Sequence, residues 1–249
     1  MSREHLKALL SFEERPISLQ ARALEQRNGC VLERLRFGLA DGGETRGLLM
    51  RPSEVGKPLP AILYPHAHGN RYDIGASELI DGRPALLGAP GPRLARAGHI
   101  VLCIDMPTFA TRADVTESAA VKAALWQGRT LFGQMLGEQA GALTWLSARS
   151  DVDPGRIGMT GMSMGATLTY VLAALDARIK VAAHLCGYAD LATLVATGAH
   201  DLHGHYLTVP GLLRATSTGA IAGLIAPRPQ LICVGRPARH GWTGHPVSG

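Results

Sequence analysis

Short apolar runs alternate with longer amphipathic stretches along this 249-residue chain, and the alternation restricts the folds that it can adopt. Apolar runs that are buried on both sides are typical of strands in a parallel sheet. Two of the intervening stretches, 130–150 and 164–177, have apolar residues at helical spacing, whereas 188–225 is less regular. Buried strands are predicted in five runs: 60–69, 99–107, 156–163, 179–187 and 229–235. The pattern therefore predicts an α/β fold, a mainly parallel sheet with helices on both faces.

The N-terminal part is expected to add a helix and a hairpin to this sheet. Residues 1–28 are predicted to form a helical extension, and 30–39 and 45–52 flank the turn-rich sequence ADGGE, which indicates an antiparallel hairpin. Residues 70–92 are rich in Gly, Pro and Asp and are predicted to form a long loop over one end of the sheet, where lids and pocket walls often lie. Because no Ser/Gly/Pro-rich linker divides the chain, we expect one domain over 1–249.

Composition excludes several classes of partner. The net charge of +5 comes from scattered arginines with no basic cluster interleaved with aromatics, which argues against nucleic-acid binding. There is no run of 18 apolar residues and no signal-peptide pattern, so we expect a cytoplasmic protein without membrane contact. The four cysteines are far apart, which favours reduced, buried thiols over disulfides or a metal site: Cys30, Cys103, Cys186 and Cys233.

Ser163 lies between two glycines in the sequence TGMSMGAT, residues 160–167. A predicted strand ends at this serine and a predicted helix begins directly after it, which is the setting of a nucleophile elbow. Gly161 and Gly165 would leave room for the sharp turn, and the new helix would direct free N–H groups and its positive dipole end at the same point. The alternative is that Ser163 is the N-cap of an ordinary helix. A cap does not require glycines two residues away on both sides, so the pattern favours a nucleophile.

Four segments together carry a family resemblance: PAILYPHAHG at 60–69, DMP at 105–107, SDVDPGRIGMTGMSMGAT at 150–167 and LIAPRPQLICVG at 224–235. From about Cys30 to Gly235 the chain resembles the α/β-hydrolase superfamily, in the branch that includes dienelactone hydrolases and acetyl xylan esterases. The resemblance implies a serine hydrolase that uses no metal and no organic cofactor.

The resemblance also implies roles for individual residues. Ser163 matches the nucleophile, and the backbone N–H groups of Met164 and His68 match the donors that hold the oxyanion. Position 67 is Ala where the family usually has Gly. The side chains of His66 and His68 are expected to anchor their loop by hydrogen bonds rather than to act as acid or base.

The acid and base that would activate the serine are harder to find. The family supplies the acid just after the strand that ends at Gly235, and the histidine after one further strand. After Asp201, which has no clear role, this sequence contains no Asp or Glu. Asp190 follows a predicted strand directly and is the best remaining acid, while Asp176 reads as a capping residue at a helix end. His240 could reach Ser163 as a base on extended-chain length.

Residues 236–249 depart from the family pattern and form an atypical tail. We expect the chain to be truncated or altered after Gly235 and to lack the final strand and helix of the fold. Strand 229–235 would then be an exposed apolar edge, which favours homo-oligomers formed through that edge.

These observations predict a hydrolase that attacks a small-molecule carboxylic ester through an acyl-enzyme on Ser163. Two alternatives remain open from the residues. The chain could keep the elbow but lack the acid and histidine, and so be a catalytically defective remnant or a binding module. It could also be a serine peptidase, which would share the same elbow.

Overall fold

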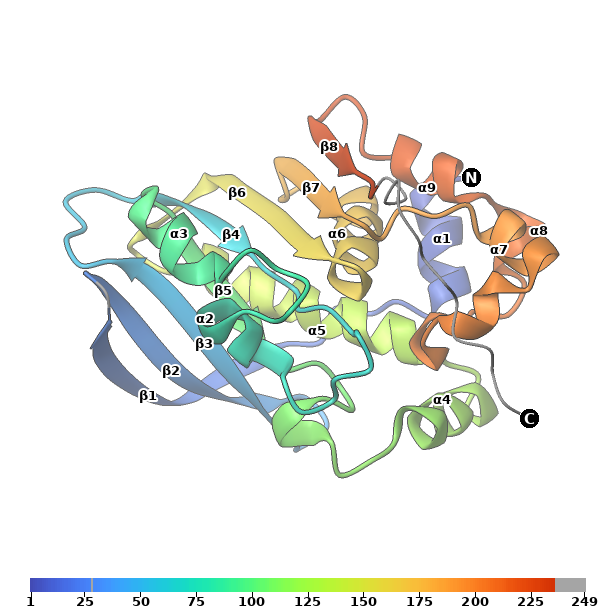
Figure 1. Cartoon of the computed structure of the whole chain (residues 1–249), viewed down its shortest axis with the longest axis horizontal. Helices are drawn as coiled ribbons and strands as arrows, with labels where there is room; N and C mark the ends of the chain where they lie inside the picture. Colours follow the sequence, from blue (N-terminus) through green and yellow to red (C-terminus); the bar gives the residue numbers. More distant parts are fainter. Residues whose placement is uncertain (28, 236–249) are drawn as a thin grey trace.

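A mixed eight-stranded sheet organises the chain in a computed structural model that describes residues 1–27 and 29–235 (Figure 1). The strand order is β1-β2-β3-β5-β4-β6-β7-β8. The first four strands in this order pair antiparallel and the others pair parallel, as the alternation of apolar runs predicts. The strands are β1 (Ile17–Arg27), β2 (Cys30–Leu39), β3 (Glu44–Pro52), β4 (Leu59–Leu63), β5 (Ile100–Ile104), β6 (Val152–Met162), β7 (Val181–Leu185) and β8 (Gln230–Cys233).

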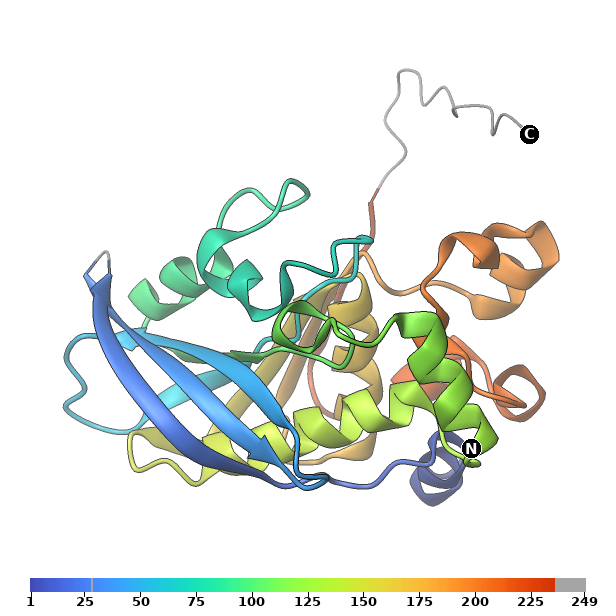
Figure 2. The ribbon, with the colours of Figure 1, turned by 90° about the horizontal axis from the view of Figure 1, so that it is seen from below.

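Helices cover both faces of the sheet. Helices α2 and α3 lie on one face, and α5 and α6 lie on the other (Figures 1 and 2). The chain between β7 and β8 carries α7 and α8 beyond the carboxyl ends of the parallel strands. The helices are α1 (Arg3–Leu10), α2 (Glu78–Asp81), α3 (Pro90–Arg96), α4 (Glu117–Trp126), α5 (Leu131–Ser147), α6 (Met164–Leu175), α7 (Leu191–Thr197), α8 (Leu212–Ala215) and α9 (Thr218–Gly223), with short 3-10 turns η1 (Gly75–Ser77), η2 (Ala110–Arg112), η3 (Ala199–Leu202) and η4 (His205–Leu207).

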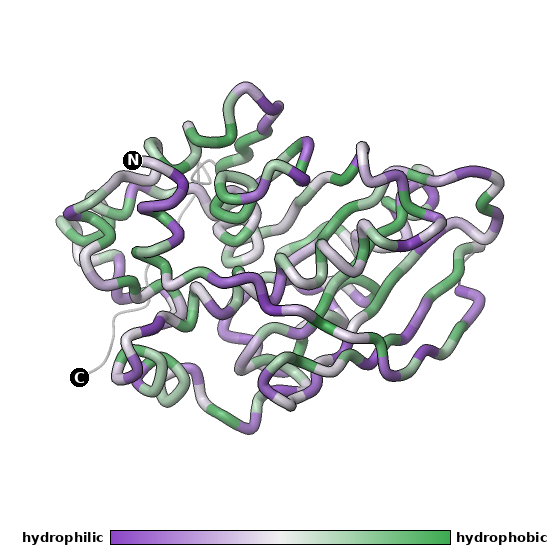
Figure 3. Tube along the Cα trace, turned by 180° about the vertical axis from the view of Figure 1, so that it is seen from behind, coloured by the Kyte–Doolittle hydropathy of each residue, from purple (hydrophilic) through white to green (hydrophobic). Residues whose placement is uncertain are grey.

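The central strand β5 explains why the apolar runs are nearly continuous. Successive side chains of a strand point to opposite faces. Ile100, Leu102 and Ile104 therefore enter the larger core under α5 and α6, whereas Val101 and Cys103 enter the smaller core under α2 and α3. Hydrophobic residues accordingly run along the central strands and the helices beside them (Figure 3).

The prediction of a helical extension over residues 1–28 is wrong in its second half. Only Arg3–Leu10 is helical, and Ile17–Arg27 forms the edge strand β1, which pairs antiparallel with β2. Ala, Leu, Gln, Glu and Arg dominate this segment and favour helices in isolation. The ladder of backbone hydrogen bonds that β2 offers outweighs that local preference.

The segment predicted as a long loop over 70–92 contains short helical turns that pack into the fold. Glu78 on α2 is fully buried, pairs with Arg83, and accepts hydrogen bonds from Tyr64 Oη at 2.7 Å and from the Ala67 N–H at 3.1 Å. The segment is thus fastened to the loop that follows β4.

The last described strand, β8, is not buried as the apolar run suggested. Leu231 is 57% exposed and Ile232 is 40% exposed, because β8 lies at the edge of the described sheet. This agrees with the expectation of an apolar edge. Residues 236–249, for which we expected an atypical tail, lie outside the described residues.

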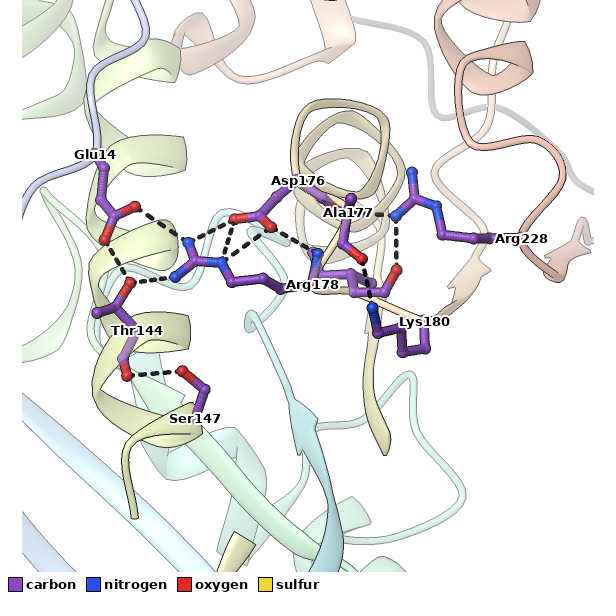
Figure 4. Close-up of polar contacts among 9 residues, drawn as sticks. Glu14, Thr144, Ser147, Asp176, Ala177, Arg178, Lys180 and Arg228 are labelled. Atoms are coloured by element: carbon purple, nitrogen blue, oxygen red, sulfur yellow. Dashed lines mark hydrogen bonds and ion pairs between the residues drawn. The ribbon is translucent and has the colours of Figure 1, made fainter. Parts of the chain in front are cut away.

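Asp176 holds the turn between α6 and β7 and has the structural role that the sequence suggests. Its carboxylate accepts a hydrogen bond from the Arg178 N–H at 2.8 Å and pairs with the Arg178 guanidinium at 2.6 Å (Figure 4). Arg178 also pairs with Glu14 at 3.1 Å, and Arg228 donates to the Asp176 carbonyl at 2.8 Å. The network joins the N-terminal segment to the end of α6 and the start of β7. Asp176 therefore has a structural role in these hydrogen bonds and ion pairs.

Candidate active site

Ser163 is the single residue between β6, which ends at Met162, and α6, which begins at Met164. Its backbone has φ 54° and ψ −117°, a conformation that non-glycine residues rarely adopt. The Ser163 N–H donates to the Leu185 carbonyl at 2.9 Å and thereby fastens the turn to β7. Strain of this kind costs about 1–3 kcal/mol and is concentrated at functional sites.

The alternative of an ordinary N-cap does not agree with the geometry. A capping serine has extended backbone angles and accepts a hydrogen bond from the first helical turn. Thr130 does this at the start of α5, where it accepts from the Gly133 N–H at 2.9 Å. Within the described chain, the Ser163 side chain makes no capping hydrogen bond to α6. The hydroxyl is therefore not used to stabilise the helix.

The two glycines around Ser163 are needed because the loop after β4 packs directly on the turn. A Cβ on Gly161 would lie 2.6 Å from the Pro65 carbonyl oxygen. A Cβ on Gly165 would overlap the same oxygen and lie 3.1 Å from the His66 carbonyl oxygen. Both glycines thus allow the loop 65–68 to lie against the elbow.

We expect Gly165→Ala to lower the free energy of unfolding by about 2–3 kcal/mol, because backbone atoms of Pro65 and His66 would have to move. Urea denaturation measures the change. Gly56→Ala is the matched control, because a Cβ at Gly56 would meet nothing within 4 Å, and its effect should stay within about 0.5 kcal/mol. Equal stability of the two variants would contradict the close packing of loop and elbow.

Two backbone N–H groups near the elbow are available for a ligand. Met164 is the first residue of α6, so its N–H has no acceptor within the helix. In the loop, the Ala67 N–H is used by Glu78, whereas no described residue accepts a hydrogen bond from the His68 N–H. These are the two amides for which the sequence suggests an oxyanion role.

The side chains of His66 and His68 anchor the loop, as expected. His66 Nε2 accepts from the Met106 N–H at 3.2 Å, and burial lowers the pKa of this ring. His68 Nδ1 accepts from the Asn70 N–H at 3.1 Å, which places the ring proton on Nε2, 3.1 Å from Glu117 Oε2. Neither ring nitrogen of His68 is left to act as a base.

Glu117 joins its own helix, α4, to the loop that carries His68 and Tyr72 and to the segment that carries Tyr206. Its buried carboxylate accepts from His68, from Tyr72 Oη at 2.7 Å and from the Tyr206 N–H at 2.7 Å. Burial alone would raise the pKa of Glu117, but the hydrogen bonds from these three groups outweigh it and lower the pKa to about 2. A Cβ on Gly204 would lie only 2.6 Å from His68 Nε2, so the backbone at Gly204 packs directly against the His68–Glu117 pair. The role of Glu117 could not be predicted from the sequence, because its partners are distant along the chain.

Ser163 opens into a cavity of about 80 Å³ whose walls come from α6, from residues 186–189 and from the segment around η4. Cys186, an exposed cysteine rather than the buried one expected, lines this cavity. His203 also lines it, and it is the histidine of the described residues that shares a cavity with the serine. Its neighbours in the sequence form no motif, and so its position could not be predicted.

Asp190 and His184 do not line this cavity, although Ala189 and Leu191 on either side of Asp190 do. The exposed Asp190 caps α7 through the Ala192 N–H at 3.3 Å and accepts from Thr193 Oγ1 at 2.6 Å, which lowers its pKa. His184 is a fully buried histidine that contacts Gln230 at 3.1 Å. His240 lies outside the described residues.

Two further features bear on the class of protein. Over residues 1–27 and 29–235, no group of three or more His, Cys, Asp or Glu side chains is arranged to hold a metal ion. In the same part of the chain no helix has the length and apolar character needed to cross a membrane.

Comparison with known proteins supplies the family. Residues 41–222 match the model of the family described as X-Pro dipeptidyl-peptidase (S15 family). YtaP of Bacillus subtilis (strain 168), which is provisionally named a hydrolase, is 39% identical over 224 residues, which cover 90% of this chain and 75% of YtaP.

Solved structures show the same fold. A protein of Bacteroides fragilis NCTC 9343 that is provisionally named an acetyl xylan esterase superposes with a TM-score of 0.73 at 19% identity, over 92% of this chain. This chain spans 65% of that structure, slightly less than two thirds of its length. The acetyl xylan esterase from Paenibacillus sp. R4 gives a TM-score of 0.59 at 20% identity, over 92% of this chain and 76% of that one. At these identities the likeness concerns the fold alone.

Three observations point to the same fold and family. They are the strained strand-to-helix turn, the sheet order and the match over residues 41–222. The chain is an α/β-hydrolase and belongs to the X-Pro dipeptidyl-peptidase (S15) family of hydrolases.

Proposed function

We propose that the protein is a serine hydrolase that cleaves small-molecule carboxylic esters through an acyl-enzyme on Ser163. The observation that carries this proposal is the backbone of Ser163, whose strained angles are maintained although the hydroxyl caps no helix within the described chain. Such a conformation persists only where the surrounding structure enforces it, and it is typical of a nucleophile elbow.

In the proposed reaction, Ser163 Oγ attacks the ester carbonyl carbon while a base takes the hydroxyl proton. The oxygen of the tetrahedral intermediate becomes negative and is held by the N–H groups of Met164 and His68. Collapse of the intermediate breaks the bond to the alcohol, which leaves with a proton from the same base. Water then attacks the acyl-enzyme and releases the acid. These steps require no metal and no organic cofactor.

We assign the base to His203. It lines the cavity into which Ser163 opens, and three residues further along the chain the Tyr206 N–H donates to Glu117, which anchors this segment. The Asp190 carboxylate accepts hydrogen bonds from the Ala192 N–H and from Thr193 Oγ1 at the start of α7, so capping this helix is the role that we assign to it.

We expect His203→Gln to lower kcat/KM for an activated ester about 10²-fold or more, because a general base contributes at least that factor. His205→Gln is the control, since His205 is exposed in the same segment and lines neither cavity near the serine. An unchanged rate in His203→Gln would show that another group accepts the proton, and His240→Gln would then be the next variant to assay.

A serine peptidase is the second candidate, because the description of the family names X-Pro dipeptidyl-peptidases. The two functions are separated by assaying p-nitrophenyl esters beside Xaa-Pro p-nitroanilides. We expect turnover of the esters and none of the anilides. The opposite result would favour the peptidase, and no turnover of either would favour a fold that has lost catalysis.

We further propose a cytoplasmic location and self-association through β8. The four cysteines are unpaired, and Leu231 and Ile232 expose apolar surface at the edge of the described sheet.

A further inference from the structure

A second cavity, of about 410 Å³, lies beyond the carboxyl ends of the strands, between α7, the η3–η4 segment and α8. Its volume is within the range of about 300–1,000 Å³ that is usual for small-molecule sites. Aliphatic side chains dominate its walls, among them Leu191, Leu194, Leu207 and Leu212. The described residues that line it include no Asp or Glu.

This apolar cavity adjoins the smaller cavity at Ser163. Leu191, His203 and Leu207 line both. The serine cavity itself, at about 80 Å³, has room for little more than the reacting ester group. Any long substituent of a substrate bound at Ser163 must therefore leave this cavity, and the apolar cavity is the space that adjoins it.

Some of the apolar wall is open to solvent when the cavity is empty. Val195 on α7 is 52% exposed and Leu213 on α8 is 42% exposed. Covering such side chains with an aliphatic chain removes apolar surface from water and is favourable. The polar side chains of the lining are His200, His203, Thr208 and Arg214, and the aliphatic side chains outnumber them.

We propose that this apolar cavity binds an aliphatic chain of the substrate, so that the preferred esters carry a chain of about six to ten carbons rather than an acetyl group. The inference rests on the proposed function of Ser163. It differs from the acetyl esters that the names of the structural neighbours suggest.

The first test measures kcat/KM for p-nitrophenyl esters from acetate to decanoate, and for acetate esters of alcohols of the same lengths. We expect kcat/KM to rise about threefold for each added methylene, up to a chain of about eight carbons, in one of the two series. The series that shows the rise assigns the cavity to the acyl group or to the alcohol. A flat profile in both series, with measurable turnover, would overturn the inference and leave the proposed function intact.

The second test uses Val195→Asp, which places a charge on the cavity wall at an exposed position. This variant should lose the dependence on chain length, so that its kcat/KM for the octanoate ester falls to about its own value for the acetate ester. Leu87→Asp is the matched control, because Leu87 is fully exposed and does not line the cavity, and it should keep the full chain-length profile. Identical profiles for the two variants would overturn the inference.

Direct binding separates the inference from catalysis. Methyl octanoate has about six more methylenes than methyl acetate, so at threefold for each it should bind to the Ser163→Ala protein roughly 700-fold more tightly in calorimetry. Val195→Asp in the same background should remove this difference. If wild type fails to turn over any ester but this binding difference is found, the proposed function fails and the apolar site stands. Equal binding of the two esters would overturn the site itself.

Discussion

Ser163→Ala should lower the turnover of p-nitrophenyl esters by at least about 10³-fold. The hydroxyl is the only group in the proposed reaction that forms a covalent bond to the substrate, so its removal leaves only the stabilisation of the oxyanion by backbone N–H groups. The fold should be kept, because within the described chain the Ser163 hydroxyl caps no helix. Steady-state kinetics together with a denaturation curve measure both expectations.

Ser150→Ala is the control for this prediction. Ser150 is exposed at the end of the α5–β6 turn, away from the elbow, so its replacement should leave turnover unchanged. If Ser163→Ala retained turnover close to wild type, the nucleophile would have to be another residue.

Glu117→Gln should lower the free energy of unfolding at neutral pH by about 3 kcal/mol. The carboxylate is buried and accepts hydrogen bonds from His68, Tyr72 and Tyr206. An amide accepts fewer hydrogen bonds, carries no charge, and would leave at least one of these donors poorly paired. The same change loosens the segment that carries His203, so kcat/KM should also fall, by about tenfold.

The pH dependence of stability tests the role of Glu117 independently. Its pKa is about 2 in the folded protein, against 4.5 for the group without these partners. A carboxyl whose pKa is lowered by folding contributes its full stability above the unfolded value and loses it as the pH falls through the folded value. The wild-type protein should therefore lose this contribution between about pH 4.5 and 2, and Glu117→Gln should lack it. Glu54→Gln, at an exposed position, should follow the wild-type curve, and a similar curve for Glu117→Gln would contradict the account.

The elbow and the central strands could be predicted because their signals are local. The glycines at 161 and 165 and the strand that ends at Met162 lie within a few residues of Ser163. The five residues of β5 are likewise all apolar and all buried, so the sequence of this strand alone indicates that both of its faces are covered. In these segments local preference and tertiary environment agree, so the sequence pattern is a faithful guide.

The remaining parts of the site depend on contacts between distant residues. Glu117 and Tyr206 are 89 residues apart, and neither belongs to a recognisable motif. His203 lines the serine cavity because the chain between β7 and β8 passes beyond the carboxyl ends of the strands. The sequence of that segment is irregular and does not predict this path. Strand β1 was missed for a similar reason, since its pairing with β2 overrides residues that favour a helix.

The most direct test of the central claim is the identification of the residue that a fluorophosphonate probe modifies. After incubation and proteolysis, mass spectrometry should find the adduct on the peptide that contains Ser163 and should find none in the Ser163→Ala protein. Modification of a different residue, or no modification of the folded wild-type protein, would contradict the assignment of Ser163 as an activated nucleophile.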